Sequence, residues 1–282
     1  MKLRSLLFVP GDRPDRMEKA AATSGADALI LDLEDAVALT QKDVARAEVA
    51  KFLKLDRQLP LFVRVNPLDS GMIDDDLAAV LPGKPDAIVL PKAEGRASLK
   101  ELDSKLDWAG AKGVAILPIA TETPAAMFQL GTYGRVTNRL LGLTWGAEDL
   151  PAAIGAISSR EEDGSYTQPY QVARSLTLFG AHAAGVQAIE TVYPAFRDLD
   201  GLAAYAARGR RDGFTGMMAI HPAQVPVINA AFTPSEAEIA HARAVIAAFA
   251  ANPDAGALSL DGKMIDRPHV KQAERILALA GE

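Results

Sequence analysis

The sequence predicts a TIM (β/α)8 barrel with a C-terminal helical extension. Eight short runs rich in Val, Ile and Leu alternate with longer Ala-rich stretches along the 282 residues. Apolar strands with helices between them are typical of a parallel sheet that is buried on both faces, and a single barrel of this kind needs about 250 residues. The rival fold is an open doubly wound sheet, but no Gly-rich dinucleotide-binding motif follows the first strand. Eight strand–helix units therefore favour the closed barrel.

The predicted strands are spaced along most of the chain. In order they read LRSLLFVP, ADALILDLED, PLFVRVNP, DAIVLPKA, GVAILPIATE, RLLGLTWGAED, VQAIETVY and FTGMMAIHP. Helices are expected over about residues 14–24 and 41–53, after the first two strands. Thr123 followed by Pro124 predicts the N-cap and first position of the helix after the fifth strand. Glu122 would then be the last residue of that strand.

The C-terminal region lies outside the eight units. It contains an Ala-rich helical stretch, then the segment ANPDAGALSLDGKMIDRPHV, then a second helical stretch. We expect the barrel to occupy residues 1–232. The extension would occupy residues 233–282 and pack on the barrel or on a neighbouring subunit.

Composition excludes several classes of function. The net charge is −6 and no broad basic surface is implied, so a nucleic-acid partner is not expected. The chain has no cysteine, which excludes disulfides and thiolate chemistry. No stretch approaches the roughly 20 apolar residues of a membrane span. A cytoplasmic protein without a membrane partner is the expectation.

Arg64 is the first candidate for binding an anion. Alternate residues of a strand share a face, so Arg64 lies opposite the apolar face of Leu61, Val63 and Val65. That apolar face suits the helix layer, and Arg64 then points into the mouth of the barrel, where an unpaired cation would be costly. A bound carboxylate could pair with it bidentately. The alternative is an internal salt bridge to an acid on a neighbouring strand.

Acidic residues of the second strand share the inward face. In LILDLED, Asp32 and Glu34 alternate with apolar residues, and Asp35 follows them. We expect Glu34 or Asp35 to lie nearest the ligand and Asp32 to lie deeper, with a structural role. The alternative is that all of them form a structural charge network with Arg64.

Glu122 and Asp149 are the predicted metal ligands. Each is expected where a strand of the barrel ends, and the two strands are consecutive, so the carboxylates can converge on one site. Two carboxylates leave the remaining positions around Mg²⁺ for water and substrate oxygens. The alternatives are a plain N-cap for Asp149 and a carboxylate favoured by a helix dipole for Glu122.

Cationic side chains are expected around the rim of the barrel. Lys92 ends the fourth strand, and Arg13, Arg16 and Lys19 follow the first. Such a cluster could bind phosphate groups, although a solvated charged rim is the alternative for each residue.

These motifs, taken in order, resemble a known family. SLLFVPGDRPDRMEKA, LDLEDAV, VRVNP, LPKAE, WGAEDL and GFTGMMAIHP resemble the citrate lyase β-subunit-like family of CoA-ester lyases, which belongs to the HpcH/HpaI aldolase superfamily and includes malyl-CoA and citramalyl-CoA lyases. The resemblance covers nearly the whole chain. It departs from the family pattern where Ala126 replaces a glycine and where Met217 replaces a lysine.

The resemblance implies a homotrimeric TIM barrel with Mg²⁺ at its C-terminal mouth. It places the metal on Glu122 and Asp149, and the substrate carboxylate and developing oxyanion near Arg64. It makes Asp266 the catalytic acid, supplied by the extension of a neighbouring subunit. The phosphates of coenzyme A would lie near Arg13, Arg16, Lys19 or Lys92.

The implied reaction is cleavage of a β-hydroxyacyl-CoA to acetyl-CoA and a 2-oxo acid. Other reactions stay open: the same cleavage on an acyl-carrier-protein thioester, as in citrate lyase, hydrolysis of the CoA ester, or a metal-dependent aldolase reaction on free hydroxy-oxo acids. Free-acid aldolases of similar fold usually carry a histidine where this chain has Asp35, which disfavours the last. A non-catalytic subunit is disfavoured by the intact Arg64, Glu122 and Asp149.

Overall fold

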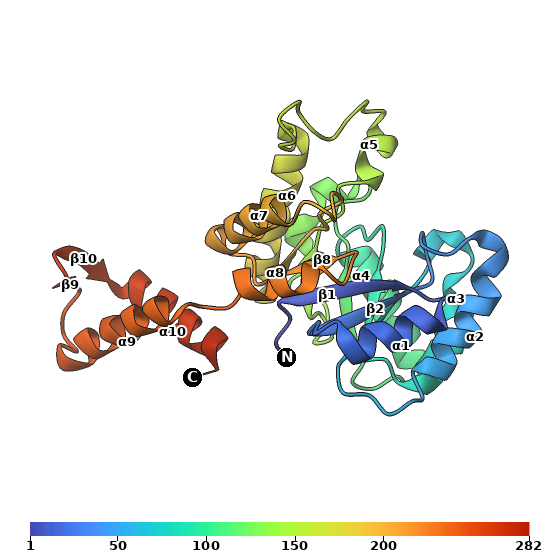
Figure 1. Cartoon of the computed structure of the whole chain (residues 1–282), viewed down its shortest axis with the longest axis horizontal. Helices are drawn as coiled ribbons and strands as arrows, with labels where there is room; N and C mark the ends of the chain where they lie inside the picture. The colour runs from blue at the N-terminus through green and yellow to red at the C-terminus, as the bar shows by residue number, and fades with distance from the viewer. Residues whose placement is uncertain (282) are drawn as a thin grey trace. The chain divides into compact units, whose positions relative to one another are not determined.

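The chain forms two compact units. The structure is a computed structural model that describes residues 1–281. One unit contains residues 3–229, and the other contains residues 1–2 and 230–282. Figure 1 shows the parallel strands and their helices in the first unit and the helices α9 and α10 in the second.

A closed barrel of eight parallel strands forms the larger unit. The strands are ordered β5-β4-β3-β2-β1-β8-β7-β6. The two ends of this order meet through parallel bridges that pair Ile116 with Leu140 and Ile119 with Thr144. The predicted TIM barrel and all eight predicted strands are thereby confirmed. The strands are β1 (Ser5–Pro10), β2 (Ala28–Asp32), β3 (Leu61–Arg64), β4 (Ala87–Leu90), β5 (Ala115–Pro118), β6 (Gly142–Thr144), β7 (Gln187–Glu190) and β8 (Gly216–Ala219).

Helices connect most of the strands. The two helices expected early in the chain are confirmed to within a residue or two. The helices of this unit are α1 (Pro14–Thr23), α2 (Lys42–Phe52), α3 (Ile73–Val80), α4 (Arg96–Trp108), α5 (Asp149–Ile154), α6 (Gln168–Ala184) and α7 (Leu199–Asp212), with α8 (Gln224–Ala231) at its end. Short 3-10 turns occur at η1 (Leu39–Gln41), η2 (Leu68–Ser70), η3 (Leu81–Gly83), η4 (Ala126–Phe128) and η5 (Leu130–Thr132).

The prediction of a helix after the fifth strand is wrong. The expected cap does form, since the hydroxyl of Thr123 accepts a hydrogen bond from the N–H of Ala126, but the chain continues only as η4 and η5. Tertiary contacts hold this segment instead: the hydroxyl of Tyr133 donates to the carbonyl of Ala93 and accepts from the N–H of Gly95. Strand β5 also ends at Pro118, so Glu122 lies in the following loop.

Alternation along the strands builds the core. A buried cluster gathers inward-facing residues of seven of the eight barrel strands, all except β6, and includes Leu6, Ile30, Phe62, Val89 and Leu117. Asp32 and Arg64 follow Ile30 and Phe62 by two residues, on the same face of their strands. The polar side chains at the strand ends therefore lie above an apolar floor.

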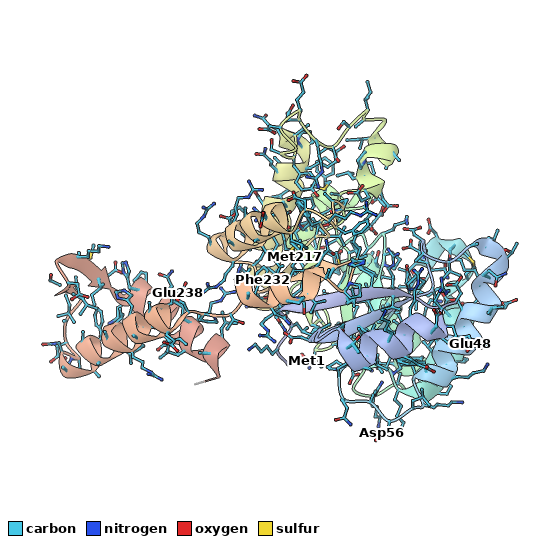
Figure 2. The ribbon with its side chains drawn as sticks, viewed as in Figure 1. Met1, Glu48, Asp56, Met217, Phe232 and Glu238 are labelled. Carbon is cyan, nitrogen blue, oxygen red and sulfur yellow. The ribbon has the colours of Figure 1, made fainter. Side chains whose placement is uncertain are left out.

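The second unit has its own small core. Helix α9 (Glu236–Ala251), strands β9 (Ala257–Leu260) and β10 (Lys263–Asp266) and helix α10 (Arg267–Ala280) pack around Val245, Phe249 and Ile265. Ser235 and Glu238, the latter labelled in Figure 2, form a capping box at the start of α9. The irregular stretch expected between the two helices contains a β-hairpin, whose Asp261-Gly262 turn has positive φ at both residues.

No helix within residues 1–281 is both long enough and apolar enough to cross a membrane.

Candidate active site

A cavity of about 330 Å³ lies at the C-terminal ends of the barrel strands. A larger groove of about 1260 Å³ lies beside Trp108, next to the segments that precede β4 and β5. Active sites of (β/α)8 barrels form at the C-terminal ends of the strands, so the smaller cavity is the candidate. Its wall includes apolar residues of the core and a set of charged side chains: Arg16, Asp32, Asp35, Arg64, Glu122, Glu148 and Asp149.

Arg64 points into this cavity, as predicted from the strand alternation. Its guanidinium forms a bidentate ion pair with Asp32, at 2.7 Å from Nε and 2.6 Å from Nη2. Its Nη1 lies 2.9 Å from Glu34 Oε2, and the guanidinium stacks 4.9 Å above the ring of Phe8. Burial alone would lower the pKa of Arg64, but the hydrogen bonds and charge of Asp32 raise it above its usual value. The guanidinium is thus a fixed cation on the cavity wall.

Asp32 has the deeper position that was expected of it. Its side chain is buried, and besides Arg64 it accepts hydrogen bonds from the backbone N–H groups of Glu34 and Ala36. One carboxylate therefore fixes both the guanidinium and the loop that follows β2. This arrangement is the internal salt bridge considered as the alternative for Arg64, and it leaves Arg64 on the cavity wall.

Glu34 and Asp35 differ in their surroundings. Glu34 is buried, and its Oε1 lies 2.6 Å from Lys92 Nζ. Burial raises the pKa of Glu34, while Arg64 and Lys92 counter that effect. Asp35 has a side chain 58% exposed, with its Oδ2 3.7 Å from Arg64. Asp35 therefore lines the cavity with an accessible carboxylate, whereas Glu34 is engaged by two cations.

A buried network behind this loop was not predicted. The ammonium of Lys42 donates to the carbonyls of Leu33 and Glu34 and to Asn66 Oδ1, at 2.6, 2.7 and 2.9 Å. Asn66 in turn donates twice to the fully buried Asp76. The signal in the sequence was a lysine on the buried stripe of α2, where Lys42, Ala45, Val49 and Phe52 recur at helical spacing.

Glu122 and Asp149 both line the cavity. Glu122 Oε2 accepts a 2.7 Å hydrogen bond from the backbone N–H of Lys92. Its Oε1 accepts no hydrogen bond from any of residues 1–281. Oε1 lies close to Gly146, because a Cβ at that residue would be only 2.8 Å from it. Burial and the negative charge of Asp149 raise the pKa of Glu122 to about 8. The cation that lies beside this pair is the ammonium of Lys92, 3.4 Å from Asp149 Oδ1.

This donor set fits Mg²⁺. Mg²⁺ prefers carboxylate oxygens and usually binds proteins through one or two carboxylates, with waters and substrate oxygens completing its shell. Within residues 1–281, no group of three or more acidic or histidine side chains converges to hold a metal by itself. Glu122 and Asp149 would therefore supply two ligands and leave the rest of the shell open.

The predicted phosphate-binding cations lie in different environments. Arg13 is paired with Asp15 on the surface, at 2.8 Å, and Lys19 is exposed on α1. Arg16 borders the cavity. Lys92 does not stand on an open rim: its ammonium lies between Glu34 and Asp149. Binding of coenzyme A by any of them stays a prediction.

Asp266 lies in the C-terminal unit, at the N-cap of α10. Its Oδ1 lies 2.6 Å from Nδ1 of His269, in a capping box. Its side chain is partly exposed. Its role as an acid toward a neighbouring subunit stays a prediction.

Comparison with known proteins gives the family. The sequence profile of the HpcH/HpaI aldolase/citrate lyase family matches residues 4–222. The chain belongs to the HpcH/HpaI aldolase/citrate lyase family. The resemblance inferred from the motifs is confirmed.

Similar proteins include enzymes that act on CoA esters. The mitochondrial citramalyl-CoA lyase of Mus musculus is 35% identical over 297 residues, which cover 98% of this chain and 86% of that protein. The (3S)-malyl-CoA thioesterase of Cereibacter sphaeroides is 37% identical over 282 residues, covering 98% and 94%. This family of CoA-ester lyases is the class of enzyme that the sequence predicted.

A solved structure supports the expected cofactor. The CitE protein of Mycobacterium tuberculosis, in complex with magnesium, acetoacetate and coenzyme A, superposes with a TM-score of 0.83 at 36% identity, over 100% of this chain and 99% of that chain. Magnesium and coenzyme A therefore accompany a close structural relative, in agreement with the prediction of Mg²⁺ and a CoA-linked ligand.

Proposed function

We propose that this protein is a Mg²⁺-dependent carbon–carbon lyase that cleaves a malyl-CoA or citramalyl-CoA type of β-hydroxyacyl-CoA to acetyl-CoA and a 2-oxo acid. The observation that carries the proposal is one cavity lined by Glu122, Asp149 and the fixed guanidinium of Arg64. Two carboxylates that could bind Mg²⁺ and a guanidinium that could bind a carboxylate match the charges of such a substrate.

Glu122 and Asp149 would hold the metal. Bound there, Mg²⁺ would polarise the hydroxyl of the substrate and stabilise negative charge on the 2-oxo acid. Arg64 would bind the acyl carboxylate, because Asp32 fixes the guanidinium before the substrate arrives. The cavity of about 330 Å³ suits the acyl part of the substrate, with the bulk of coenzyme A outside it.

Asp35 is the better placed of the two acids after β2 to accept the hydroxyl proton. Its carboxylate lines the cavity, while Glu34 is tied to Lys92 and Arg64. As the proton leaves the hydroxyl, the bond between the hydroxyl carbon and the α carbon breaks. Its electron pair passes to the α carbon as the enolate of acetyl-CoA. Asp266 of a neighbouring subunit in a homotrimer would protonate that enolate.

Hydrolysis of the CoA ester is the second candidate. A malyl-CoA thioesterase and a citramalyl-CoA lyase match this chain at similar identity. Thioester hydrolysis would release free CoA and an intact hydroxy acid, whereas lysis would release acetyl-CoA and a 2-oxo acid. The two outcomes can be separated by their products.

The test is incubation with Mg²⁺ and malyl-, methylmalyl- and citramalyl-CoA, with separate detection of 2-oxo acid and free thiol. Release of 2-oxo acid without free thiol supports the lyase, and its loss in Glu122→Gln and Asp149→Asn supports the metal ligands. A native circular dichroism spectrum of each variant is the control. Thiol release without 2-oxo acid would replace the lyase by the thioesterase, and full activity in both variants would remove the metal assignment.

A further inference from the structure

Lys92 has a backbone conformation that is uncommon for a side-chain-bearing residue. Its φ is +51°, in the left-handed region, which glycine adopts without strain and other residues rarely adopt. Such strain persists where the surroundings impose it and is concentrated at functional sites. Here the conformation directs the N–H of Lys92 at Glu122 Oε2, 2.7 Å away.

The side chain of Lys92 contacts two further acids. Its Nζ lies 2.6 Å from Glu34 Oε1 and 3.4 Å from Asp149 Oδ1. One residue therefore contacts acids that follow three strands: Glu34 after β2, Glu122 after β5 and Asp149 at the start of α5 after β6. Glycine at this position would keep the backbone contact and lose both side-chain contacts.

The charge around the cavity explains why an ammonium is held there. Arg64 pairs with Asp32, so Arg16 and Lys92 are further cations near the four carboxylates of Glu34, Asp35, Glu122 and Asp149. An ammonium close to Asp149 lowers the repulsion between these carboxylates, but it also repels any divalent cation that approaches the same oxygen.

We propose that Lys92 is a positioning residue of the metal site, whose ammonium neutralises Glu34 and Asp149 in the absence of metal and keeps the affinity for free Mg²⁺ low. This inference rests on the proposed function, because it takes Glu122 and Asp149 as the metal ligands. Mg²⁺ is then held firmly only when an anionic substrate adds its own oxygens to the site.

The test measures metal affinity without substrate, by calorimetric titration of the full chain with Mg²⁺ and by the electron paramagnetic resonance signal of free Mn²⁺. Lys92→Met removes the charge and keeps an unbranched side chain. Lys92→Asn is a second variant, since asparagine tolerates left-handed backbone. Both should bind Mg²⁺ at least about tenfold more tightly than the unmodified protein, because a positive charge within a few ångströms of the metal is lost.

Two controls isolate the position of the charge. Lys92→Arg keeps a cation there and should restore an affinity within about threefold of the unmodified protein. Lys51→Met removes a lysine that pairs with Glu48 on the surface and should leave the affinity unchanged, because exposed charges are screened.

Unchanged or weaker Mg²⁺ binding in folded Lys92→Met and Lys92→Asn would overturn the inference. In that case, loss of Mg²⁺ binding in the double variant Glu122→Gln/Asp149→Asn would show that the proposed metal site itself still stands. If binding survives in that double variant, the metal lies elsewhere, and the proposed metal site fails together with the role of Lys92.

Discussion

The guanidinium of Arg64 has one orientation because Asp32 holds two of its nitrogens. The remaining Nη1 faces Glu34 and Asp35 at the cavity. A flat, forked cation fixed in this way can bind a carboxylate in one defined geometry. At the scale of a residue, the proposed substrate orientation would therefore depend on Arg64 as an arginine, not only as a positive charge.

Arg64→Lys tests this dependence. Lysine cannot reproduce the bidentate pair with Asp32, so we expect kcat/KM for cleavage to fall by about a hundredfold or more, with Mg²⁺ affinity little changed. Steady-state kinetics and a Mg²⁺ titration on the same preparation measure both quantities. Near-normal kcat/KM would mean that Arg64 does not orient the substrate.

Gly146 tests the position of a single carboxylate oxygen. A Cβ at this residue would lie 2.8 Å from Glu122 Oε1, so Gly146→Ala forces the carboxylate to move. We expect Mg²⁺-dependent activity to fall at least about tenfold, with a matching loss of Mg²⁺ affinity. An alanine variant with unchanged affinity would show that Oε1 is not a metal ligand.

The sequence predicted these residues well where strand alternation applies. Arg64 and Asp32 lie on the inward face because a two-residue period fixes their direction once the barrel is assumed. Lys92 was predicted only as a rim cation. Its contact with Glu34 and Asp149 depends on a left-handed backbone turn after β4, which no pattern of residue types around it signals.

The loop after β2, which carries Glu34 and Asp35, is held in place by the helix that follows it. Lys42, at the start of α2, donates to the carbonyls of Leu33 and Glu34, so the helix supports the loop that presents Glu34 and Asp35. The ammonium is buried, and burial lowers the pKa of Lys42. Removing a buried ammonium that donates to three acceptors lowers the free energy of unfolding, because those acceptors are left unsatisfied.

Lys42→Met should therefore destabilise the protein by about 2 kcal/mol or more, since three buried acceptors lose their donor. Urea unfolding monitored by circular dichroism measures the loss. Lys51→Met is the matched control: it breaks an exposed pair with Glu48 and should change stability by less than about 0.5 kcal/mol. Equal stability of the two variants would contradict the structural role of Lys42.

At the scale of elements, the strands were predicted more reliably than the segments between them. Apolar runs such as LILD and AIVL form β2 and β4 as expected. The helix expected after Thr123-Pro124 does not form, because the contacts of Tyr133 hold the segment in 3-10 turns. Such contacts join residues that are distant in sequence, and local capping signals do not include them.

The molecule as a whole separates the barrel from a C-terminal unit that carries Asp266. The sequence indicated the two helices of this unit but not the hairpin between them, although Asp261-Gly262 between apolar residues is a recognised turn signal. The proposed mechanism needs Asp266 at the cavity of another subunit. Catalysis would then require an oligomer.

Complementation between inactive variants tests this requirement. Arg64→Lys disables the cavity and Asp266→Asn disables the acid, so each variant alone should have little activity. Co-expressed subunits should recover a measurable fraction of the activity, because an intact cavity can meet an intact Asp266 from its neighbour. Failure to recover activity in a confirmed mixed oligomer would contradict catalysis between subunits.

The central claim is that Glu122 and Asp149 together bind a divalent cation at the C-terminal mouth of the barrel. Anomalous X-ray diffraction from crystals grown with Mn²⁺ tests it most directly. The account predicts an anomalous peak in the cavity at about 2.1 Å from one oxygen of each carboxylate, and no such peak for Glu122→Gln with Asp149→Asn. A Mn²⁺ peak bound elsewhere, or a peak that contacts neither carboxylate, would contradict it.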